Sequence, residues 1–323
     1  MPTSRPRSPS TLLALLTLLA VATATAATGC GAPAPASRVA SARVTAAPAA
    51  PSASPLSSPS LSSPAAPPIA EGGTVATLPA APGGRTPVFT HAGRGPGGGR
   101  GDSRDGGQGH RRVALTFDAD MTADQGARAA RGERFDHPAL IATLRRLKVP
   151  ATVFMTGRWA EEYPDQARSI GRDPLFEVAN HSYSHHAFTP SCYGLPTVPP
   201  GGMRDDVEQA FTAFRRVGVR SVPYFRFPGG CYDDRALRAV APTGVTAVQW
   251  DVVGGDAFAR DPDRVVDQVL SGVRDGSVVV LHCTRSAAPV TEEAVRRIVP
   301  ALRGRGYRTV KVSELIGGPA PPS

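Results

Sequence analysis

Apolar and polar residues alternate along residues 113–317 in two patterns, one typical of short buried strands and one typical of amphipathic helices. The strand pattern covers 113–117, 151–155, 175–180, 222–228, 245–250, 277–282 and 307–312. The helix pattern lies between these strands and starts near 136, 205, 234, 261 and 291. Strands that alternate with helices predict a parallel sheet with crossover helices, and about seven strands favour a barrel over an open sheet.

Residues 31–112 show neither pattern. Ala, Pro, Ser and Gly dominate them, in runs such as "APAAPSASPLSSPSLSSPAAPP". Such a segment buries too little apolar surface to offset the loss of chain entropy on folding. We therefore predict a disordered tether at 31–112 and one folded domain at 113–317.

The first 30 residues have the layout of a secretory signal. Arg5 and Arg7 precede an apolar stretch over 12–21, which is too short to span a bilayer comfortably. The following "ATGC" ends at Cys30 and resembles a bacterial lipobox. We predict an extracytoplasmic protein with a signal peptide at 1–30 and a lipid on Cys30; plain secretion and an uncleaved anchor are the alternatives.

The basic charge of the chain is concentrated before the folded domain. The formal net charge is +9, but residues 1–112 hold 10 basic and 3 acidic residues, whereas the remainder holds 26 and 24. A nucleic-acid-binding protein would carry its basic patch on the folded domain, so we expect no nucleic-acid partner. The basic tether suits an anionic cell wall or membrane surface; the alternative is that these charges only aid solubility.

Two carboxylates follow the first predicted strand, in "VALTFDADMT". Asp118 and Asp120 stand where the strand gives way to a loop, which is where α/β enzymes keep their reactive groups. A single Asp at such a place is more often a turn or cap residue. The pair therefore needs support from other strand ends.

That support comes from "HSYSHH", directly after the strand at 175–180. His181 and His185 are four residues apart, a spacing that would present both imidazoles on one side of a helical turn to a single ion. One Asp and two His form a ligand set that suits a catalytic divalent ion. A structural or solvated His pair is the alternative.

Three further strand ends carry polar groups: Arg226, then Asp251 and Asp256, and then His282. An arginine between Phe225 and Phe227 is costly to bury unless it pairs with a carboxylate. In a barrel all of these strand ends meet at one rim.

In chain order, "TFDAD", "HSYSH", "RFPGG", "WDVVGGD" and "VVLH" resemble the five motifs of the polysaccharide deacetylases, the NodB-homology family also known as carbohydrate esterase family 4. The similarity runs from about 112 to 317. The resemblance implies an α/β fold, a distorted (β/α)7 barrel, and a metal-dependent hydrolase that removes N- or O-acetyl groups from a polysaccharide such as chitin, peptidoglycan or xylan.

The first motif departs from the family pattern TFDDG, in which the first Asp is the base and the second binds the metal. Asp118 matches the base, but Ala119 occupies the ligand position. The metal carboxylate then comes from Asp120, from Asp118 itself, or from neither. Residues two apart on a strand point to the same side, which favours Asp120 beside His181 and His185. The expected ion is Zn²⁺, with Co²⁺ or Mn²⁺ as alternatives.

The resemblance also implies roles around the metal. Asp118 would accept the proton of the attacking water while Arg226 holds it ionised, and His282, oriented by Asp256, would protonate the leaving group. A backbone N–H near Tyr193 would stabilise the oxyanion. Trp250 and Leu281 would wall the acetyl pocket.

Three cysteines remain beyond Cys30. Cys192 and Cys231 each lie in a loop that follows a motif, so we expect a disulfide between them, with Cys283 free and buried beside His282. A zinc site built from these thiols is the alternative, although no CxxC spacing is present.

Two other functions stay open beside the deacetylase. Ala119 would fit an inactive glycan-binding module that has lost its metal, and a metal-dependent amidase acting on cell-wall peptides would use a similar site. The sequence leaves the oligomeric state open, with a monomer as the default expectation.

Overall fold

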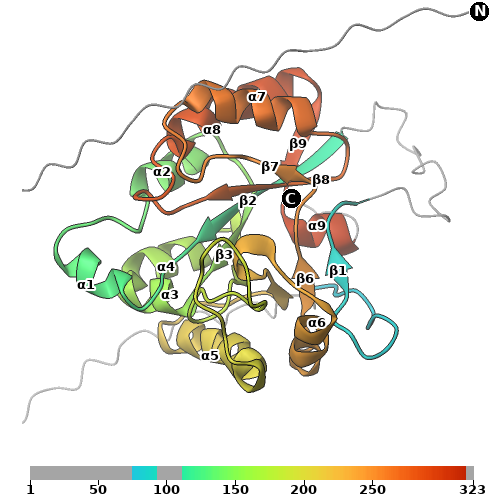
Figure 1. Ribbon diagram of the computed structural model, residues 1–323. Helices are drawn as coiled ribbons and strands as arrows, with labels where there is room; N and C mark the ends of the chain where they lie inside the picture. Colours follow the sequence, from blue (N-terminus) through green and yellow to red (C-terminus); the bar gives the residue numbers. More distant parts are fainter. Residues whose placement is uncertain (1–74, 93–110, 318–323) are drawn as a thin grey trace, which may run out of the picture. The chain divides into compact units, whose positions relative to one another are not determined.

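The structure is a computed structural model that describes residues 75–92 and 111–317 (Figure 1). The signal peptide, Cys30 and most of the predicted tether lie outside the described residues. Within the described part, no helix is long and apolar enough to cross a membrane.

One curved sheet forms the centre of the described part, and every pairing between its strands is parallel. The strand order is β1-β6-β5-β4-β3-β2-β8-β7, with β9 paired to β2. The strands are β1 (Val88–Phe89), β2 (Arg111–Ala119), β3 (Ala151–Met155), β4 (Phe176–Asn180), β5 (Tyr224–Phe225), β6 (Thr246–Val248), β7 (Val252–Val253), β8 (Ser277–His282) and β9 (Tyr307–Val310).

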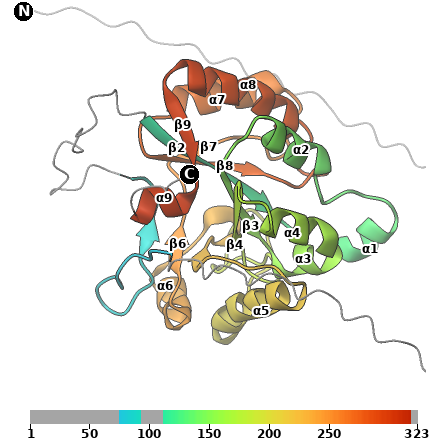
Figure 2. The ribbon, with the colours of Figure 1, turned by 180° about the vertical axis from the view of Figure 1, so that it is seen from behind.

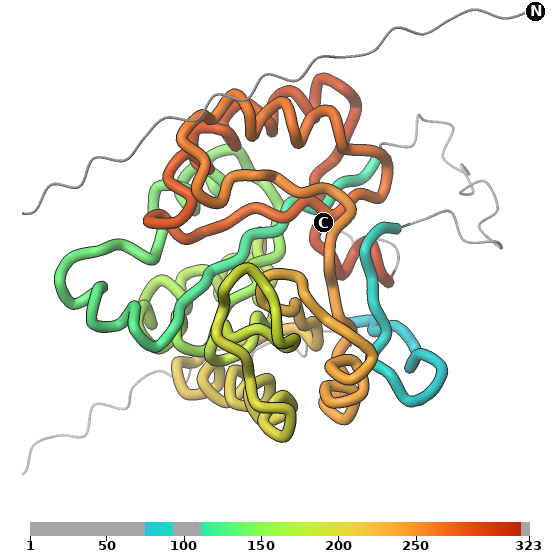
Figure 3. Tube along the Cα trace, viewed as in Figure 1, coloured from blue at the N-terminus to red at the C-terminus, as the bar shows by residue number. Residues whose placement is uncertain are grey.

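The sheet curls into a barrel because its two sides are joined by a very short connection. Strand β6 lies near one end of the strand order and β7 at the other, yet only residues 249–251 separate Val248 from Val252. Four residue steps span at most about 14 Å, so the two sides of the sheet approach each other here. Figure 3 shows the chain passing directly from one to the other. The predicted barrel is thereby confirmed, with two short strands, β1 and β7, beyond the seven expected.

The helices pack mainly on the outside of this sheet, as both ribbon views show (Figures 1 and 2). An outer cluster of buried residues joins β2, β3 and β8 to helices that include α2, α3, α7 and α8. The helices are α1 (Gln125–Ala130), α2 (Pro138–Arg146), α3 (Gly157–Glu162), α4 (Pro164–Gly171), α5 (Met203–Arg216), α6 (Asp234–Val240), α7 (Pro262–Gly272), α8 (Thr291–Gly304) and α9 (Val312–Gly317).

Alternation along β2 separates the outer cluster from the barrel interior. Leu115, Phe117 and Ala119 belong to the outer cluster, whereas Ala114 belongs to a second cluster inside the barrel. Residues two apart share a face, so Asp118 is on the same side as Ala114, facing the interior. Ala119 is fully buried against the helices.

The boundary predicted for the tether is wrong for residues 75–92. Strand β1 pairs with β6, and Phe89 is only 8% exposed within the interior cluster. Val75 and Leu78 pack against the same cluster, and the Tyr224 hydroxyl donates to the carbonyl of Ala76 (2.7 Å). This segment therefore belongs to the folded domain, because β1 extends the sheet and its side chains pack into the interior cluster.

Two other sequence predictions need correction. The strand expected over 222–228 reduces to Tyr224–Phe225, because Pro223 and Pro228 have no N–H to donate to a neighbouring strand. Helices α1, α3, α4 and α9 were not expected. Each is only 6 to 8 residues long, too short for a clear helical period.

Candidate active site

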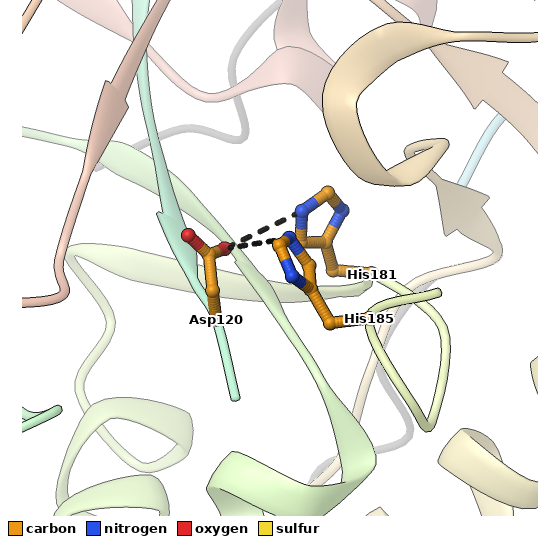
Figure 4. A group of neighbouring side chains, drawn as sticks. All are labelled: Asp120, His181 and His185. Carbon is orange, nitrogen blue, oxygen red and sulfur yellow. Dashed lines mark ion pairs between the residues drawn. The ribbon is translucent and has the colours of Figure 1, made fainter. Parts of the chain in front are cut away.

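Three side chains come together just beyond the carboxyl end of β2: those of Asp120, His181 and His185 (Figure 4). The Oδ1 atom of Asp120 lies 3.4 Å from Nε2 of His181 and 3.6 Å from Nε2 of His185. One ligand atom from each of the three residues lies within 4.8 Å of the others. The structure thus brings together the residues that the sequence grouped as metal ligands.

The two histidines come from a loop and not from the expected helical turn. Ser182 and His185 have φ values of 68° and 58°, in the left-handed region that interrupts a helix. The loop is held by Asn180 Oδ1, which accepts the Ser182 N–H (2.8 Å), and by the carbonyl of Asp206, which accepts the Tyr183 N–H (3.1 Å). Strained backbone that is held by its surroundings is common at functional sites.

The geometry fits a divalent ion. Two ligand atoms bonded to a tetrahedral zinc ion at about 2.0–2.1 Å lie about 3.3–3.4 Å apart, close to the separations from Asp120 Oδ1. That oxygen is buried and has no hydrogen-bond partner among the described residues, which is costly for a carboxylate unless a cation approaches it. His181 Nδ1 lies 3.0 Å from the carbonyl of Arg226, so a proton on Nδ1 leaves Nε2 free to bind.

Electrostatics keep Asp120 and His185 in forms that bind a cation. Burial lowers the pKa of His185 to about 4, so its imidazole is neutral at neutral pH. Burial alone would raise the pKa of Asp120, but the nearby His185 and His181 outweigh it and hold the pKa well below its usual range. A carboxylate and neutral imidazoles are the protonation states that metal binding requires.

Asp118 is held by a different partner. Its Oδ1 accepts a hydrogen bond from Nη1 of Arg226 (2.6 Å), and its Oδ2 lies 3.7 Å from Nε2 of His181. The Arg226 side chain is fully buried; its Nε donates to the carbonyl of Val248 and its guanidinium stacks 3.9 Å from the ring centroid of Phe154. The structure therefore supplies the carboxylate partner that the buried arginine requires.

His282, the last residue of β8, forms a second ion pair on the neighbouring strand. Its Nδ1 lies 2.9 Å from Oδ1 of Asp256, and its backbone N–H donates to Oδ2 (2.7 Å). Burial would lower the pKa of His282, but the charge of Asp256 and its hydrogen bond outweigh this and raise the pKa to about 10. His282 therefore holds a proton at neutral pH, with Nε2 turned away from Asp256.

Two supporting residues had no signal in the sequence. The Thr291 hydroxyl donates to Oδ2 of Asp256 (2.6 Å), and the Thr284 hydroxyl accepts the backbone N–H of Asp120 (3.0 Å). Both threonines are buried. Only the fold brings Thr291 to Asp256, 35 residues earlier in the chain.

The disulfide between Cys192 and Cys231 is confirmed, and Cys283 is free and buried as expected. The disulfide joins the loop after β4 to the loop after β5.

An added Cβ at Gly229 would lie 3.4 Å from the ring of Tyr193, which is 89% exposed. Trp250 packs against the interior cluster, with its ring centroid 5.4 Å from the Arg226 guanidinium. The roles predicted for Tyr193 and Trp250 remain predictions.

Leu281 does not lie on the interior face that would wall an acetyl pocket. It is fully buried in the outer cluster, because alternation along β8 turns it away from the side that His282 faces. Val280 lies on the same side of β8 as His282. Asp251 also lies apart from the site: its carboxylate accepts the N–H of Val278 (2.8 Å) and the hydroxyl of Ser277 (3.0 Å).

Comparison with known proteins identifies the class. The family model "Polysaccharide deacetylase" matches residues 105–248. A chitooligosaccharide deacetylase of Sinorhizobium fredii is 32% identical over 184 residues, which cover 53% of this chain and 80% of that protein. A peptidoglycan-N-acetylglucosamine deacetylase of Bacillus cereus is 27% identical over 188 residues, covering 55% and 81%. The chain belongs to the polysaccharide deacetylase family, a family of hydrolases.

Solved structures agree on the fold. A family 4 carbohydrate esterase from Streptomyces lividans, in complex with acetate, aligns with a TM-score of 0.53 and 26% identity, over 66% of this chain and 98% of that one. A mutant CE4 family pseudoenzyme with restored enzymatic activity aligns with a TM-score of 0.51 and 25% identity, over 64% and 68%. The parallel, curled sheet is thus the fold of this family.

Proposed function

We propose that this protein is a metal-dependent hydrolase that removes the acetyl group from N-acetylglucosamine units of a cell-wall or other extracellular glycan. The observation that carries this proposal is the buried Asp120 oxygen, which lies near His181 and His185 and has no hydrogen-bond partner in residues 75–92 and 111–317. The relatives named as chitooligosaccharide and peptidoglycan-N-acetylglucosamine deacetylases support the choice of sugar.

Asp120, His181 and His185 would hold the ion, and Zn²⁺ suits one carboxylate and two imidazoles, with Co²⁺ or Mn²⁺ as alternatives. When bound, such an ion polarises the acetyl carbonyl and lowers the pKa of water. Asp118 would accept the proton of the attacking water at Oδ2, since Oδ1 is occupied by Arg226. The hydrogen bond from Arg226 orients the Asp118 carboxylate for this step.

His282 would supply the proton that the departing amine needs. It is protonated at neutral pH because its pKa is about 10, raised by Asp256 against the effect of burial. Asp256 occupies Nδ1, so the proton on Nε2 is the one available for transfer. A general acid must hold its proton at the operating pH and must lie within reach of the leaving group.

The substitution at Ala119 makes an inactive glycan-binding module the competing function. The geometry favours the enzyme, because Asp120 reaches both histidines and Ala119 packs in the outer cluster, where a ligand would have no access to the ion. An amidase would use the same residues, so only the reaction product distinguishes it from a deacetylase.

Release of acetate tests the proposal. Purified protein would be incubated with acetylated chitooligosaccharides and with peptidoglycan, untreated, after chelation, and after chelation followed by addition of Zn²⁺, Co²⁺ or Mn²⁺. We expect acetate that disappears with chelation and returns with the metal. Bound metal without acetate release would indicate the inactive module, and free stem peptide without acetate would indicate an amidase.

We also propose that the protein is exported and held at the membrane by a lipid on Cys30. The lipobox-like "ATGC" and the basic residues before the folded domain support this placement. In a bacterial host the wild-type protein should fractionate with membranes, whereas Cys30→Ala should move it out of that fraction. Unchanged fractionation of the variant would contradict lipid anchoring.

A further inference from the structure

A basic cavity lies at the end of the barrel opposite the candidate active site, where the strands begin. It has a volume of about 450 Å³ and is formed by the start of β9, the end of α8, helix α9 and the turn between α2 and β3. Three basic side chains line it, those of Lys148, Arg303 and Arg308, together with one acidic side chain, that of Glu314. A cavity lined mainly by one sign of charge concentrates ions of the opposite sign.

The single acid balances only one of the three basic groups. Oε2 of Glu314 lies 3.7 Å from Nη2 of Arg308, and its Oε1 accepts the backbone N–H of Lys311 (3.1 Å). Within residues 75–92 and 111–317, neither Lys148 nor Arg303 forms an ion pair with a carboxylate. The described residues therefore leave an excess of positive charge in the cavity, which suits an anionic ligand.

Arg303 is held by backbone carbonyls and not by an acid. Its Nη2 donates to the carbonyls of Leu147 (2.6 Å) and Lys148 (3.2 Å). Arg111, on the neighbouring strand β2, is held in a similar way, with its guanidinium carbon 4.3 Å from the ring centroid of Tyr307. Carbonyls and aromatic rings orient a guanidinium without cancelling its charge, so these groups are preorganised for an anion from outside.

The backbone of Lys148 indicates that its side chain has a role. Helices α2, α5 and α8 end in the same way, with a residue of positive φ that donates its N–H to the carbonyl three residues earlier. That residue is Gly218 (74°) after α5 and Gly306 (77°) after α8, but it is Lys148 (50°) after α2. Glycine adopts this conformation at little cost, whereas a residue with a Cβ is strained. The lysine is thus retained against the preference of the backbone.

The proposed membrane anchor is attached at this end of the barrel. Residues 1–74, which include Cys30, join the described part at Val75. The next residue, Ala76, lies against the end of α9, since an added Cβ at Gly317 would be 2.5 Å from the Cβ of Ala76. Both ribbon views show α9 beside β9 and the start of β2 (Figures 1 and 2). The chain that leads to Cys30 therefore enters the domain beside the elements that form the cavity.

We infer that this cavity binds the phosphate group of an anionic phospholipid, such as phosphatidylglycerol, in the membrane to which Cys30 is proposed to be anchored. In the described part no exposed large hydrophobic side chain lines the cavity, so the contact with the headgroup is electrostatic. Because the candidate active site lies at the opposite end of the strands, a domain docked in this way presents it away from the membrane. The choice of a lipid as the source of phosphate rests on the proposed anchor, and acetate release does not enter the inference.

Thermal unfolding of the full-length protein with soluble short-chain lipids tests this inference. The measurement reports on the folded domain and not on the basic residues that precede it. Dihexanoylphosphatidylglycerol should raise the Tm of the wild type by roughly 3–6 °C at ten times its Kd. Dihexanoylphosphatidylcholine, which is zwitterionic, should leave the Tm unchanged, and high salt should reduce the shift caused by the anionic lipid.

Variants of the lining residues should lose this response. Lys148→Gln and Arg303→Gln should each weaken binding of the anionic lipid about tenfold or more, the usual contribution of one charge-assisted hydrogen bond. Lys148→Gly should raise the Tm without lipid, because it relieves the left-handed conformation, and should still lose the lipid response. Arg264→Gln removes an exposed arginine of α7 outside the cavity and should keep the full response. All four variants should bind Zn²⁺ and release acetate as the wild type does.

The outcomes separate this inference from the proposed function. An equal lipid-induced shift in the wild type and in both Lys148 variants would overturn the assignment to the cavity. Equal stabilisation by inorganic phosphate, or by soluble poly(glycerol phosphate) at the same concentration of phosphate groups, would overturn the choice of a lipid in favour of a free anion or a wall polymer. A lipid response that depends on Lys148 in a protein that releases no acetate would refute the deacetylase and still support the inference.

Discussion

The two ends of the barrel bury very different side chains. At the end where the strands finish, Asp118, His181, Arg226 and Asp256 are each no more than 3% exposed. The interior cluster below them, by contrast, contains Phe89, Tyr224, Val312 and Leu315, supplied by β1, β5 and α9. Most of the buried charges in the barrel gather where the strands end. The closed end is mainly apolar and buries one carboxylate, Glu177, which accepts a hydrogen bond from the Thr152 hydroxyl (2.7 Å).

This difference separates the source of stability from the source of function. Burial of apolar surface stabilises the closed end, at about 25 cal/mol per Å² removed from water. Buried charges at the other end contribute little to the free energy of unfolding, because desolvation offsets their attraction. Their retention is better explained by catalysis, and strongly shifted pKa values such as that of His282 are typical of such sites.

The largest expected effect comes from removing the proposed proton donor. His282→Ala should lower turnover by about two to four orders of magnitude, the usual contribution of a positioned acid. Metal content should stay at the wild-type level, because His282 pairs with Asp256 and not with the ligand group. Steady-state rates and metal analysis of the same preparation would check this; loss of metal would make His282 a ligand and contradict its assignment.

A carboxylate on the wrong face of β2 should damage the fold. Ala119→Asp would place a charge among apolar residues of the outer cluster without a partner, and we expect it to reduce the free energy of unfolding by roughly 3–5 kcal/mol. Chemical denaturation would measure the loss, with Ala119→Val as a control for size alone. Tighter metal binding in Ala119→Asp would instead show that position 119 faces the ion.

The other end of the barrel, whose interior is filled mainly by apolar side chains, gives the corresponding prediction. Phe89→Ala should reduce the free energy of unfolding by about 3 kcal/mol, because a ring that is 8% exposed leaves a cavity in the interior cluster. The metal affinity of the folded variant should match that of the wild type. A Phe89→Ala variant as stable as the wild type would contradict the assignment of residues 75–92 to the folded domain.

The smallest effect concerns pH. The pKa of His282 is raised to about 10, so the acid keeps its proton as pH rises until that value is reached. Asp256→Asn removes the charge that raises it, and the alkaline limb of the rate profile should move to lower pH by about one to three units. Thr291→Val keeps the charge and should move the limb less. If the alkaline limb of the rate profile falls at the same pH in the wild type and in Asp256→Asn, His282 is ruled out as the titrating acid.

The periodicity of the sequence was sufficient to predict seven of the nine strands of the described part and the polar residues at their ends. The alternation of β2 placed Asp118 and Asp120 on one side of the strand, and the strand ends at 180, 226 and 282 brought their side chains to one rim. Strand β1 was missed because it is two residues long within a segment rich in Pro and Gly. Its stability comes from pairing with β6, which no local pattern contains.

The site was predicted less completely than the fold because two of its determinants are not local. Leu281 was misplaced because the motif was taken without the alternation of its own strand, which turns it toward the helices. The hydrogen bond from Thr291 to Asp256 forms because helix α8, which follows β8 in the chain, begins beside the rim. The loop of His181 and His185 is set by Asn180 and Asp206, and the latter lies on α5.

Metal titration of two neighbouring carboxylate variants tests the central claim, that Asp120 binds the ion while Asp118 acts as the base. Zn²⁺ would be titrated into the metal-free wild type, Asp118→Asn and Asp120→Asn by calorimetry, with thermal unfolding to confirm that each is folded. Asp120→Asn should bind Zn²⁺ about 10- to 100-fold more weakly or worse, and Asp118→Asn should bind it as the wild type does while losing turnover. Weak binding in Asp118→Asn together with wild-type binding in Asp120→Asn would contradict the account.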